Sequence, residues 1–134
     1  MSIAAQILEI ARKREMMISC AESCTGGMVA AALTEHAGSS VMFDRGFVTY
    51  TNAAKIDLLG VLEASLEAHG AVSEVVAREM AMGALLRSQA QLAVSVTGIA
   101  GPGGGSEAKP VGTVFLGFAS TQFATSVKQF CFSG

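Results

Sequence analysis

The strongest constraint on the fold is a strand-like run that leads almost directly into a helix-like one. Residues 16–21 (MMISCA) form an apolar run typical of a buried strand, and residues 28–33 (MVAAAL) are rich in strong helix formers. The short segment between them ends in Thr25-Gly26-Gly27, which predicts a tight turn. The order strand, turn, helix is the first unit of an α/β pattern.

The rest of the chain continues this alternation. Apolar periodicity predicts a helix over residues 2–14 with Ile3, Ile7, Leu8 and Ala11 on its apolar face. A helix over 53–59 is expected with Thr51 or Asn52 as its N-cap, and a short helix through Leu62 and Leu66 is expected to end at His69-Gly70. A long helix follows Ser73, and its apolar face uses Val76, Met80, Gly83, Ala84 and Ala90. Strands are expected over 45–51, 92–97, 111–119 and 124–132, the last two as an antiparallel pair. We therefore expect one α/β domain spanning residues 1–134, a three-layer α/β/α sandwich with a mixed, mostly parallel sheet.

Composition excludes several classes of protein. Half of the residues are apolar, the net charge is −2, and Lys and Arg are scattered, so no basic stripe for nucleic acid is present. The apolar runs are too short to span a membrane, and the N-terminus does not read as a secretory signal. The three cysteines, Cys20, Cys24 and Cys131, fit neither a disulfide framework nor a zinc site, which favours the reducing cytoplasm and a protein without metal.

Three loops are expected to carry the chemistry. Ligands of open α/β sheets bind beyond the carboxyl ends of the parallel strands. The loops at residues 21–27, 50–55 and 97–109 follow predicted strands in this way. Reactive groups in these three segments are therefore the candidate site residues.

In the first loop, Ser23, Thr25, Gly26 and Gly27 frame a predicted anion site. The first N–H groups of a helix lack intrahelical partners and present partial positive charge, so a phosphate or an oxyanion can bind there. The alternative is that Ser23 or Thr25 merely caps the helix and the glycines allow close packing.

The third loop holds glycines at residues 98, 101 and 103–105. Such a segment lets main-chain amides approach a phosphate, although a flexible surface loop explains the same glycines. The pattern matches neither a P-loop nor the dinucleotide fingerprint.

Lys55 is the most informative charged residue, because it falls in the first turn of its helix, where the dipole disfavours a cation. Either Lys55 pairs with an anion such as Glu22, or burial lowers its pKa towards the ~7 to 8 useful for a general base. The third alternative is a solvated lysine whose stem reaches outward.

A serine hydroxyl needs a nearby base, and a neutral lysine can serve where histidine is absent. His36 and His69 lie beside predicted helix ends and are interpreted as capping or surface residues. Cys24 is the rival nucleophile, although a small thiol in an apolar chain is more often inert packing.

Four segments together resemble the CinA C-terminal domain family of nicotinamide-nucleotide amidases. They are residues 21–27 (AESCTGG), 45–52 (RGFVTYTN), 70–73 (GAVS) and 96–102 (VTGIAGP). The resemblance continues through 109–114 (KPVGTV) to 131–134 (CFSG) and so covers essentially the whole chain in order.

The resemblance implies hydrolysis of the carboxamide of nicotinamide mononucleotide to nicotinate mononucleotide and ammonia, without a cofactor or a metal. It implies Ser23 as nucleophile, Lys55 as its base and Tyr50 as a residue that orients one of them by hydrogen bonding. Main-chain amides near residues 24–26 would hold the oxyanion, while Thr97 and the glycine loop would contact ribose or phosphate. The predicted substrate-binding residues are Glu22, Cys24, Thr25, Gly26, Gly27, Thr97, Gly98 and Gly101.

The sequence also departs from the family pattern. The family's amino-terminal domain has no counterpart, and relatives continue past residues 131–134 into a helix that carries an arginine. The resemblance therefore predicts a domain without its final helix, whose exposed sheet face favours a homo-oligomer, most readily a dimer. The competing hypothesis is a catalytically silent nucleotide-binding or regulatory module, and a purely structural protein ranks last because it does not explain the loops.

Overall fold

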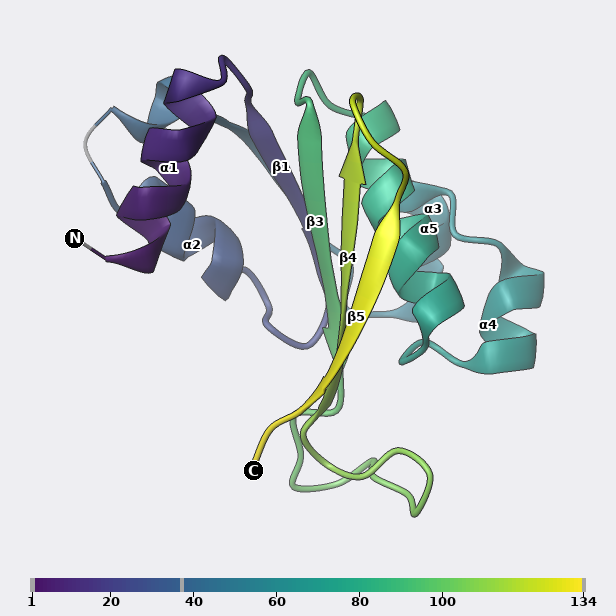
Figure 1. Ribbon diagram of the computed structural model, residues 1–134. Coiled ribbons are helices and arrows are strands. Elements are labelled where there is room, and N and C mark those ends of the chain that lie inside the picture. The colour runs from purple at the N-terminus through teal and green to yellow at the C-terminus, as the bar shows by residue number, and fades with distance from the viewer. Residues whose placement is uncertain (1, 37, 134) are drawn as a thin grey trace.

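A five-stranded sheet lies between two layers of helices (Figure 1). The computed structural model describes residues 2–36 and 38–133, so Gly134 of the last family segment lies outside it. Helices α1 (Ile3–Lys13) and α2 (Met28–Thr34) lie on one side of the sheet. On the other side lie α3 (Asn52–Leu59), α4 (Glu63–His69) and α5 (Glu74–Leu86). The predicted three-layer α/β/α architecture is confirmed.

The sheet has the strand order β2-β1-β3-β4-β5. Its strands are β1 (Ile18–Glu22), β2 (Phe43–Val48), β3 (Leu92–Gly98), β4 (Thr113–Ser120) and β5 (Ser126–Cys131). Strand β1 pairs in parallel with β2 and β3, whereas β3–β4 and β4–β5 are antiparallel. The sheet is mixed as predicted, and only β4 of these five strands runs against the others.

Predicted caps set several helix boundaries. Thr51 Oγ1 accepts a hydrogen bond from the N–H of Ala54 at the start of α3, and Gly60 ends that helix in the left-handed region. Ser73 Oγ accepts from the N–H of Val76 at the start of α5. Both predicted starts are confirmed.

Other boundaries differ from the prediction. Strand β2 ends at Val48 rather than near Tyr50, because its register with β1 ends where Val48 lies opposite Glu22. Helix α4 ends at His69 before Gly70, as predicted, and only its start differs, because Leu62 is the N-cap and the helix begins at Glu63. Ala90 is buried as expected, but it follows the end of α5 at Leu86 and belongs to the connection into β3.

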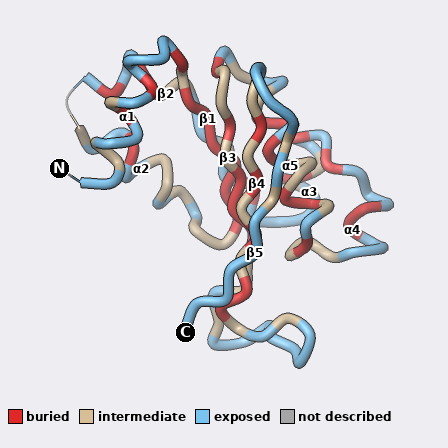
Figure 2. Tube along the Cα trace, viewed as in Figure 1, coloured by how far each residue is buried: buried red, intermediate tan, exposed pale blue. Residues whose placement is uncertain are grey.

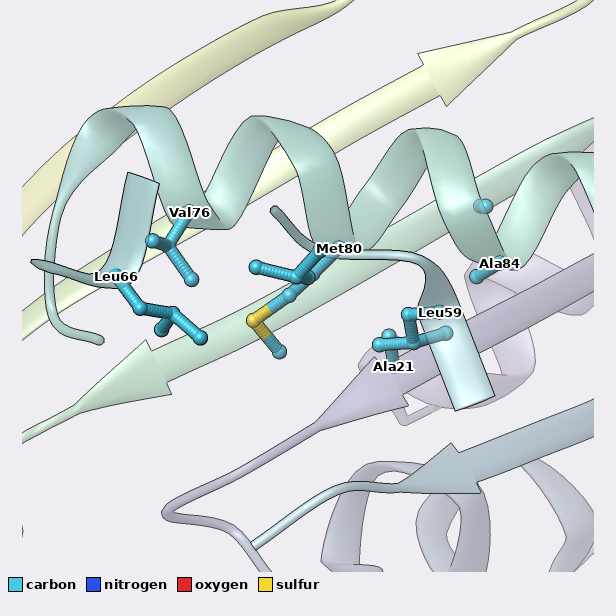
Figure 3. Close-up of a cluster of buried hydrophobic side chains, with 8 residues drawn as sticks. Ala21, Leu59, Leu66, Val76, Met80 and Ala84 are labelled. Atoms are coloured by element: carbon cyan, nitrogen blue, oxygen red, sulfur yellow. The ribbon is translucent and has the colours of Figure 1, made fainter. Parts of the chain in front are cut away.

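The larger hydrophobic core lies between α5 and the sheet (Figure 3). Its buried side chains come from α3–α5, from the α3–α4 connection and from the central strands: Ala21, Leu59, Val61, Leu66, Val76, Met80, Ala84 and Ala93. Gly83 allows α5 to approach α3, because a Cβ there would lie 2.0 Å from the Leu59 carbonyl oxygen. This packing fixes α3, and hence Lys55, against the sheet.

A second core on the opposite face consists of Leu8, Ala11, Ile18, Leu33 and Met42. The predicted buried face of α1 is therefore only partly correct. Leu8 and Ala11 are buried, whereas Ile3 and Ile7 are exposed. Ile7 instead lines an apolar groove beside the sheet.

The half of the sheet formed by β4 and β5 is open on one face. Burial alternates along β4, and the residues that face away from α5, including Leu116 and Phe118, are only half-buried. Strand β5 is largely exposed, as Figure 2 shows. An apolar groove of about 300 Å³ borders this face and is lined in part by Ile7, Ile10 and Phe123.

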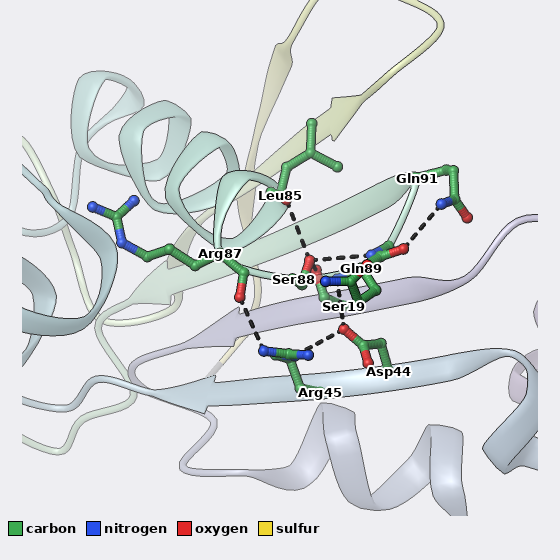
Figure 4. A network of polar contacts seen from close by, with 9 residues as sticks. Ser19, Asp44, Arg45, Leu85, Arg87, Ser88, Gln89 and Gln91 are labelled. Carbon is green, nitrogen blue, oxygen red and sulfur yellow. Dashed lines mark hydrogen bonds and ion pairs between the residues drawn. The ribbon is translucent and has the colours of Figure 1, made fainter.

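A polar network fixes the edge strand β2 to the connection between α5 and β3 (Figure 4). Arg45 donates to the carbonyl oxygen of Arg87 at 3.2 Å and pairs with Asp44 at 2.8 Å. The Asp44 carboxylate also accepts from the N–H of Gln89 at 2.8 Å.

No helix within the described ranges is long and apolar enough to cross a membrane.

Candidate active site

The three predicted loops line one cleft of about 330 Å³ beyond the carboxyl ends of the parallel strands. The α4–α5 turn adds a wall that sequence reasoning did not assign to the site, although residues 70–73 stood out as a family segment. Asn52 was considered only as a possible helix start, and it also lines the cleft. The lining residues are Ser23, Cys24, Tyr50, Asn52, Lys55, Ala71, Val72, Thr97–Ala100, Gly101, Gly103 and Gly104.

Lys55 is buried, with 1% of its surface exposed. Its Nζ donates to Ser23 Oγ at 3.0 Å, to the Thr49 carbonyl oxygen at 2.9 Å and to the Tyr50 carbonyl oxygen at 3.4 Å. Among the ion pairs of the described residues, none involves Lys55. The solvated lysine and the Lys55–Glu22 ion pair are therefore wrong.

Burial lowers the pKa of the Lys55 ammonium group below its ordinary value, and the neighbouring Cys24 thiolate opposes this shift. The three acceptors around Nζ are neutral oxygens, so no carboxylate compensates for the lost hydration. A lysine in these surroundings releases its proton more easily than one in water, as a general base requires.

Ser23 directly follows the last residue of β1. Its N–H donates to the Val96 carbonyl oxygen at 3.0 Å, which continues the pairing of β1 with β3. Its hydroxyl oxygen lies within hydrogen-bond distance of Lys55 Nζ and lines the cleft. The two groups have the geometry of a nucleophile and its base.

The structure differs from the expected role of Glu22. Its side chain is fully buried, and its carboxylate turns back to the N-terminus of α2. There it accepts from Thr25 Oγ1 at 2.5 Å and from the N–H groups of Gly27, Val29 and Ala30 at 3.1, 3.0 and 2.9 Å. A side chain enclosed in this way has no surface left for a substrate.

The predicted anion site at the start of α2 is therefore occupied by the protein itself. The N–H of Gly27 binds Glu22, and the N–H of Gly26 donates to the Ser23 carbonyl oxygen at 3.1 Å. Gly27 has a φ of 109°, a conformation that favours glycine, so its presence is explained by the turn. Neither glycine has a free amide for a ligand, and neither lines the cleft.

Cys24 is half-buried and borders the cleft beside Ser23. Burial raises the pKa of its thiol, although the N–H groups of Cys24 and Thr25 and the Lys55 cation oppose the shift. A thiol that holds its proton is a poor nucleophile, so the surroundings favour Ser23 over Cys24. Apart from the Cys24 sulfur, these two N–H groups have no acceptor among the described residues.

Tyr50 contacts the Ser23–Lys55 pair in a different way from the predicted one. Its side chain is 72% exposed, and the phenolic oxygen makes no hydrogen bond within the described part of the chain. The contact with Lys55 comes from the main-chain carbonyl oxygen. The phenol instead lies at the edge of the cleft.

Thr97, Gly98 and Gly101 also line the cleft. The Thr97 hydroxyl donates to the Ala71 carbonyl oxygen at 2.9 Å, so it joins the α4–α5 turn to β3. After Gly98, residues 99–112 form neither helix nor strand. The glycine-rich loop is irregular as predicted, but the strand expected from Val111 begins at Thr113. Lys109 ties this glycine-rich loop to the end of α4 by donating to the His69 carbonyl oxygen at 2.9 Å.

Neither histidine lies in the cleft. His36 Nε2 lies 3.1 Å from Ser2 Oγ, and exposed His69 is the last residue of α4. Within residues 2–36 and 38–133, no group of three or more His, Cys, Asp and Glu side chains is placed to hold a metal ion. The reactive groups of the cleft are therefore Ser23, Lys55 and the Cys24 thiol.

Comparison with known proteins gives consistent results at the level of family, sequence and fold. Residues 1–134 match the CinA C-terminal domain family. The chain is 60% identical to the nicotinamide-nucleotide amidohydrolase PncC of Enterobacter agglomerans over 117 residues, which are 87% of this chain and 71% of that protein. It is 52% identical to the protein of the same name from Escherichia coli K12, covering 100% of this chain and 81% of the relative.

Solved structures show the same fold. The competence/damage inducible protein CihA of Agrobacterium tumefaciens superposes with a TM-score of 0.94 at 52% identity, over 97% of this chain and 79% of that one. The competence damage-inducible protein A of Klebsiella pneumoniae gives 0.93 at 38% identity, over 98% and 81%. By sequence and by fold, the chain belongs to the CinA C-terminal domain family.

Proposed function

We propose that this chain hydrolyses the carboxamide of nicotinamide mononucleotide to nicotinate mononucleotide and ammonia. Relatives that are 52–60% identical bear the name nicotinamide-nucleotide amidohydrolase. The observation that carries the proposal is the Ser23–Lys55 pair, in which a buried amine without a counter-ion lies 3.0 Å from a hydroxyl at the cleft. A module that only bound nucleotides would have no need of such a pair.

Ser23 Oγ attacks the carboxamide carbon while neutral Lys55 Nζ takes the hydroxyl proton. The carbonyl oxygen becomes an oxyanion, for which the N–H groups of Cys24 and Thr25 are the available donors. When the intermediate collapses, the C–N bond breaks and Lys55 returns its proton to the leaving ammonia. Water then attacks the acyl ester with Lys55 again as base, which releases nicotinate mononucleotide and restores Ser23.

The remaining walls of the cleft orient the nucleotide. Thr97, Gly98 and Gly101 line the same cleft as the reacting pair and are the residues available to contact ribose and phosphate. The exposed ring of Tyr50 borders the cleft and offers a flat surface for the pyridine. Glu22, Gly26 and Gly27 act behind this surface and do not touch the substrate.

We further propose that the chain is a single domain that forms a homodimer in the reducing cytoplasm. One continuous sheet with a core on each face supports the single domain, and three free cysteines support the reducing compartment. The half-exposed face of β4 and β5 and the groove beside it support self-association. Light scattering coupled to gel filtration tests this, and a monomer at all concentrations contradicts it.

Ammonia release from nicotinamide mononucleotide tests the function. We expect Ser23→Ala to lower kcat at least ~10³-fold, because the nucleophile is lost. Ser39→Ala is the matched control, since Ser39 is equally buried but lies on the α1–α2 side of the sheet, and we expect it to retain wild-type turnover. Equal turnover by Ser23→Ala contradicts the nucleophile assignment, and substrate binding by the wild type without ammonia release identifies a silent binding module.

A further inference from the structure

Glu22 is a second fully buried ionisable group, adjacent in sequence to the nucleophile. It lies at the end of β1, and its carboxylate accepts four hydrogen bonds from the segment that follows. The Cys20 thiol adds a longer contact of 3.6 Å. A group with so many partners is held in one conformation.

These hydrogen bonds close the loop between β1 and α2 on itself. Glu22 reaches over Ser23 and Cys24 to the side chain of Thr25 and to the first turn of α2. Ser23 is thereby held on both sides, by the β1–β3 pairing through its own N–H and by the Glu22 contacts beyond it. The loop has little freedom to change the direction of the hydroxyl.

The same contacts decide which amides are left for chemistry. The N–H groups of Gly27, Val29 and Ala30 bind the carboxylate, and that of Gly26 binds the Ser23 carbonyl oxygen. Those of Cys24 and Thr25 face only the Cys24 sulfur and have no oxygen acceptor among the described residues, directly beside the nucleophile.

The carboxylate also keeps its charge in this position. Burial raises the pKa of Glu22, but the hydrogen bonds from Thr25, Ala30, Val29 and Gly27 outweigh burial and lower it overall. An anion at the N-terminus of α2 also offsets the partial positive charge of that helix end. Glu22 thus takes the place that a ligand anion would occupy.

We propose that Glu22 is a positioning residue for the Ser23 nucleophile, acting through the closed loop of residues 22–30 rather than by contact with substrate. The inference rests on the proposed amidase function. It distinguishes Glu22 from Lys55, which contacts the reacting hydroxyl directly. Loss of the Glu22 contacts lets Ser23 Oγ and the Cys24 and Thr25 amides move from their reactive positions.

Two variants test this step. Glu22→Gln keeps the shape but loses the charge and one of the accepting oxygens, and we expect kcat to fall about 100-fold, as misplacement by about 1 Å does, with KM changed less than threefold. Thr25→Val removes the shortest contact and is expected to lower kcat about tenfold. Thr34→Val is the control, because it removes a hydroxyl contact at the far end of the same helix and is expected to retain wild-type kcat.

A purely structural role predicts something different. In that case activity would fall only in proportion to the folded fraction measured by circular dichroism, and it would return at temperatures where the variant is fully folded. We expect the fully folded variants to remain slow, while the apparent pKa of the base in the pH–rate profile stays at the wild-type value because Lys55 is untouched. A folded Glu22→Gln enzyme with wild-type kcat overturns the proposal, and if that variant does not fold, wild-type kcat in folded Thr25→Val overturns it.

A second readout separates this inference from the proposed substrate. A fluorophosphonate labels an activated serine whatever amide the enzyme hydrolyses, and intact mass spectrometry follows the labelling of Ser23. We expect the order wild type and Thr34→Val, then Thr25→Val, then Glu22→Gln. If the wild type releases no ammonia from nicotinamide mononucleotide but labels in this order, the substrate is wrong and the role of Glu22 stands, whereas equal labelling rates overturn that role.

Discussion

Two neighbouring segments at the carboxyl edge of the parallel strands each bury one ionisable side chain, and the surroundings of the two side chains are opposite. Glu22, at the end of β1, has an anionic carboxylate surrounded by donors from a hydroxyl and three amides. Lys55, in the segment after β2, has an amine surrounded by the neutral oxygens of Ser23, Thr49 and Tyr50. Both pKa values are lowered, which favours the charged carboxylate of Glu22 but the neutral amine of Lys55.

The difference separates a structural charge from a chemical one. A buried carboxylate that receives hydrogen bonds from a helix N-terminus is stable as an anion and has no reason to exchange protons. A buried amine without a counter-ion is close to losing its proton and can exchange it with an adjacent hydroxyl. Burial alone therefore does not identify the reactive group, whereas the charge of its neighbours does.

The largest expected effect comes from a change that keeps the positive charge of residue 55. Lys55→Arg places a guanidinium that cannot be deprotonated beside Ser23, so we expect kcat to fall at least ~10³-fold, about 4 kcal/mol of transition-state stabilisation. Steady-state ammonia release measures this. Folded Lys55→Arg enzyme with kcat within tenfold of the wild type would show that residue 55 acts as a cation and not as a base.

The second contrast concerns stability. Glu22→Gln leaves amides of α2 without a charged acceptor, and we expect the free energy of unfolding to fall by about 2–3 kcal/mol. Lys55→Met removes a buried cation and fills the same space. We expect its free energy of unfolding to rise by about 1 kcal/mol, as is common when a catalytic group is replaced by an apolar one. Urea unfolding measures both at neutral pH. Changes of the same sign in the two variants would remove the distinction between the two buried groups.

The sequence predicts the position of the site better than the direction of its side chains. Strand, turn and helix patterns place Ser23 and Lys55 at the same sheet edge, because the carboxyl ends of parallel strands meet there. The contact of 3.0 Å between them agrees with the predicted pairing. The glycine content of the loop after Gly98 likewise predicts its irregular structure, although the strand expected from Val111 begins at Thr113.

Glu22 shows where such reasoning stops. Its sequence position beside Ser23 suggested a group that faces the ligand, but a residue at a strand end can turn either outward or back to the next helix. The Glu22 carboxylate turns back to α2 because the first N–H groups of that helix need acceptors. The sequence does not show whether a ligand or the protein's own carboxylate fills that place. Tyr50 is similar, since its main-chain oxygen rather than its phenol reaches Lys55.

The smallest expected effect is the pH dependence of stability, which separates the two groups by the pH range in which each acts. The folded-state pKa of Glu22 lies below its ordinary value of 4.5, so its stabilisation is complete above that pH and is lost as pH falls through the folded-state pKa. The folded-state pKa of Lys55 lies below 10.5, so between these two values the unfolded chain binds more protons and stability rises with pH.

Urea titration at a series of pH values gives the unfolding free energy of the wild type and of Lys55→Met. The difference between the two isolates the contribution of Lys55 to the pH dependence, because the contributions of the other ionisable groups cancel. We expect the wild type to gain stability relative to the variant as pH rises towards 10.5. The same subtraction with Glu22→Gln should be flat over this alkaline range and slope only in acid. A flat Lys55→Met difference would mean that Lys55 keeps an ordinary pKa in the folded state, and a neutral amine would then be too scarce at neutral pH to serve Ser23 as a base.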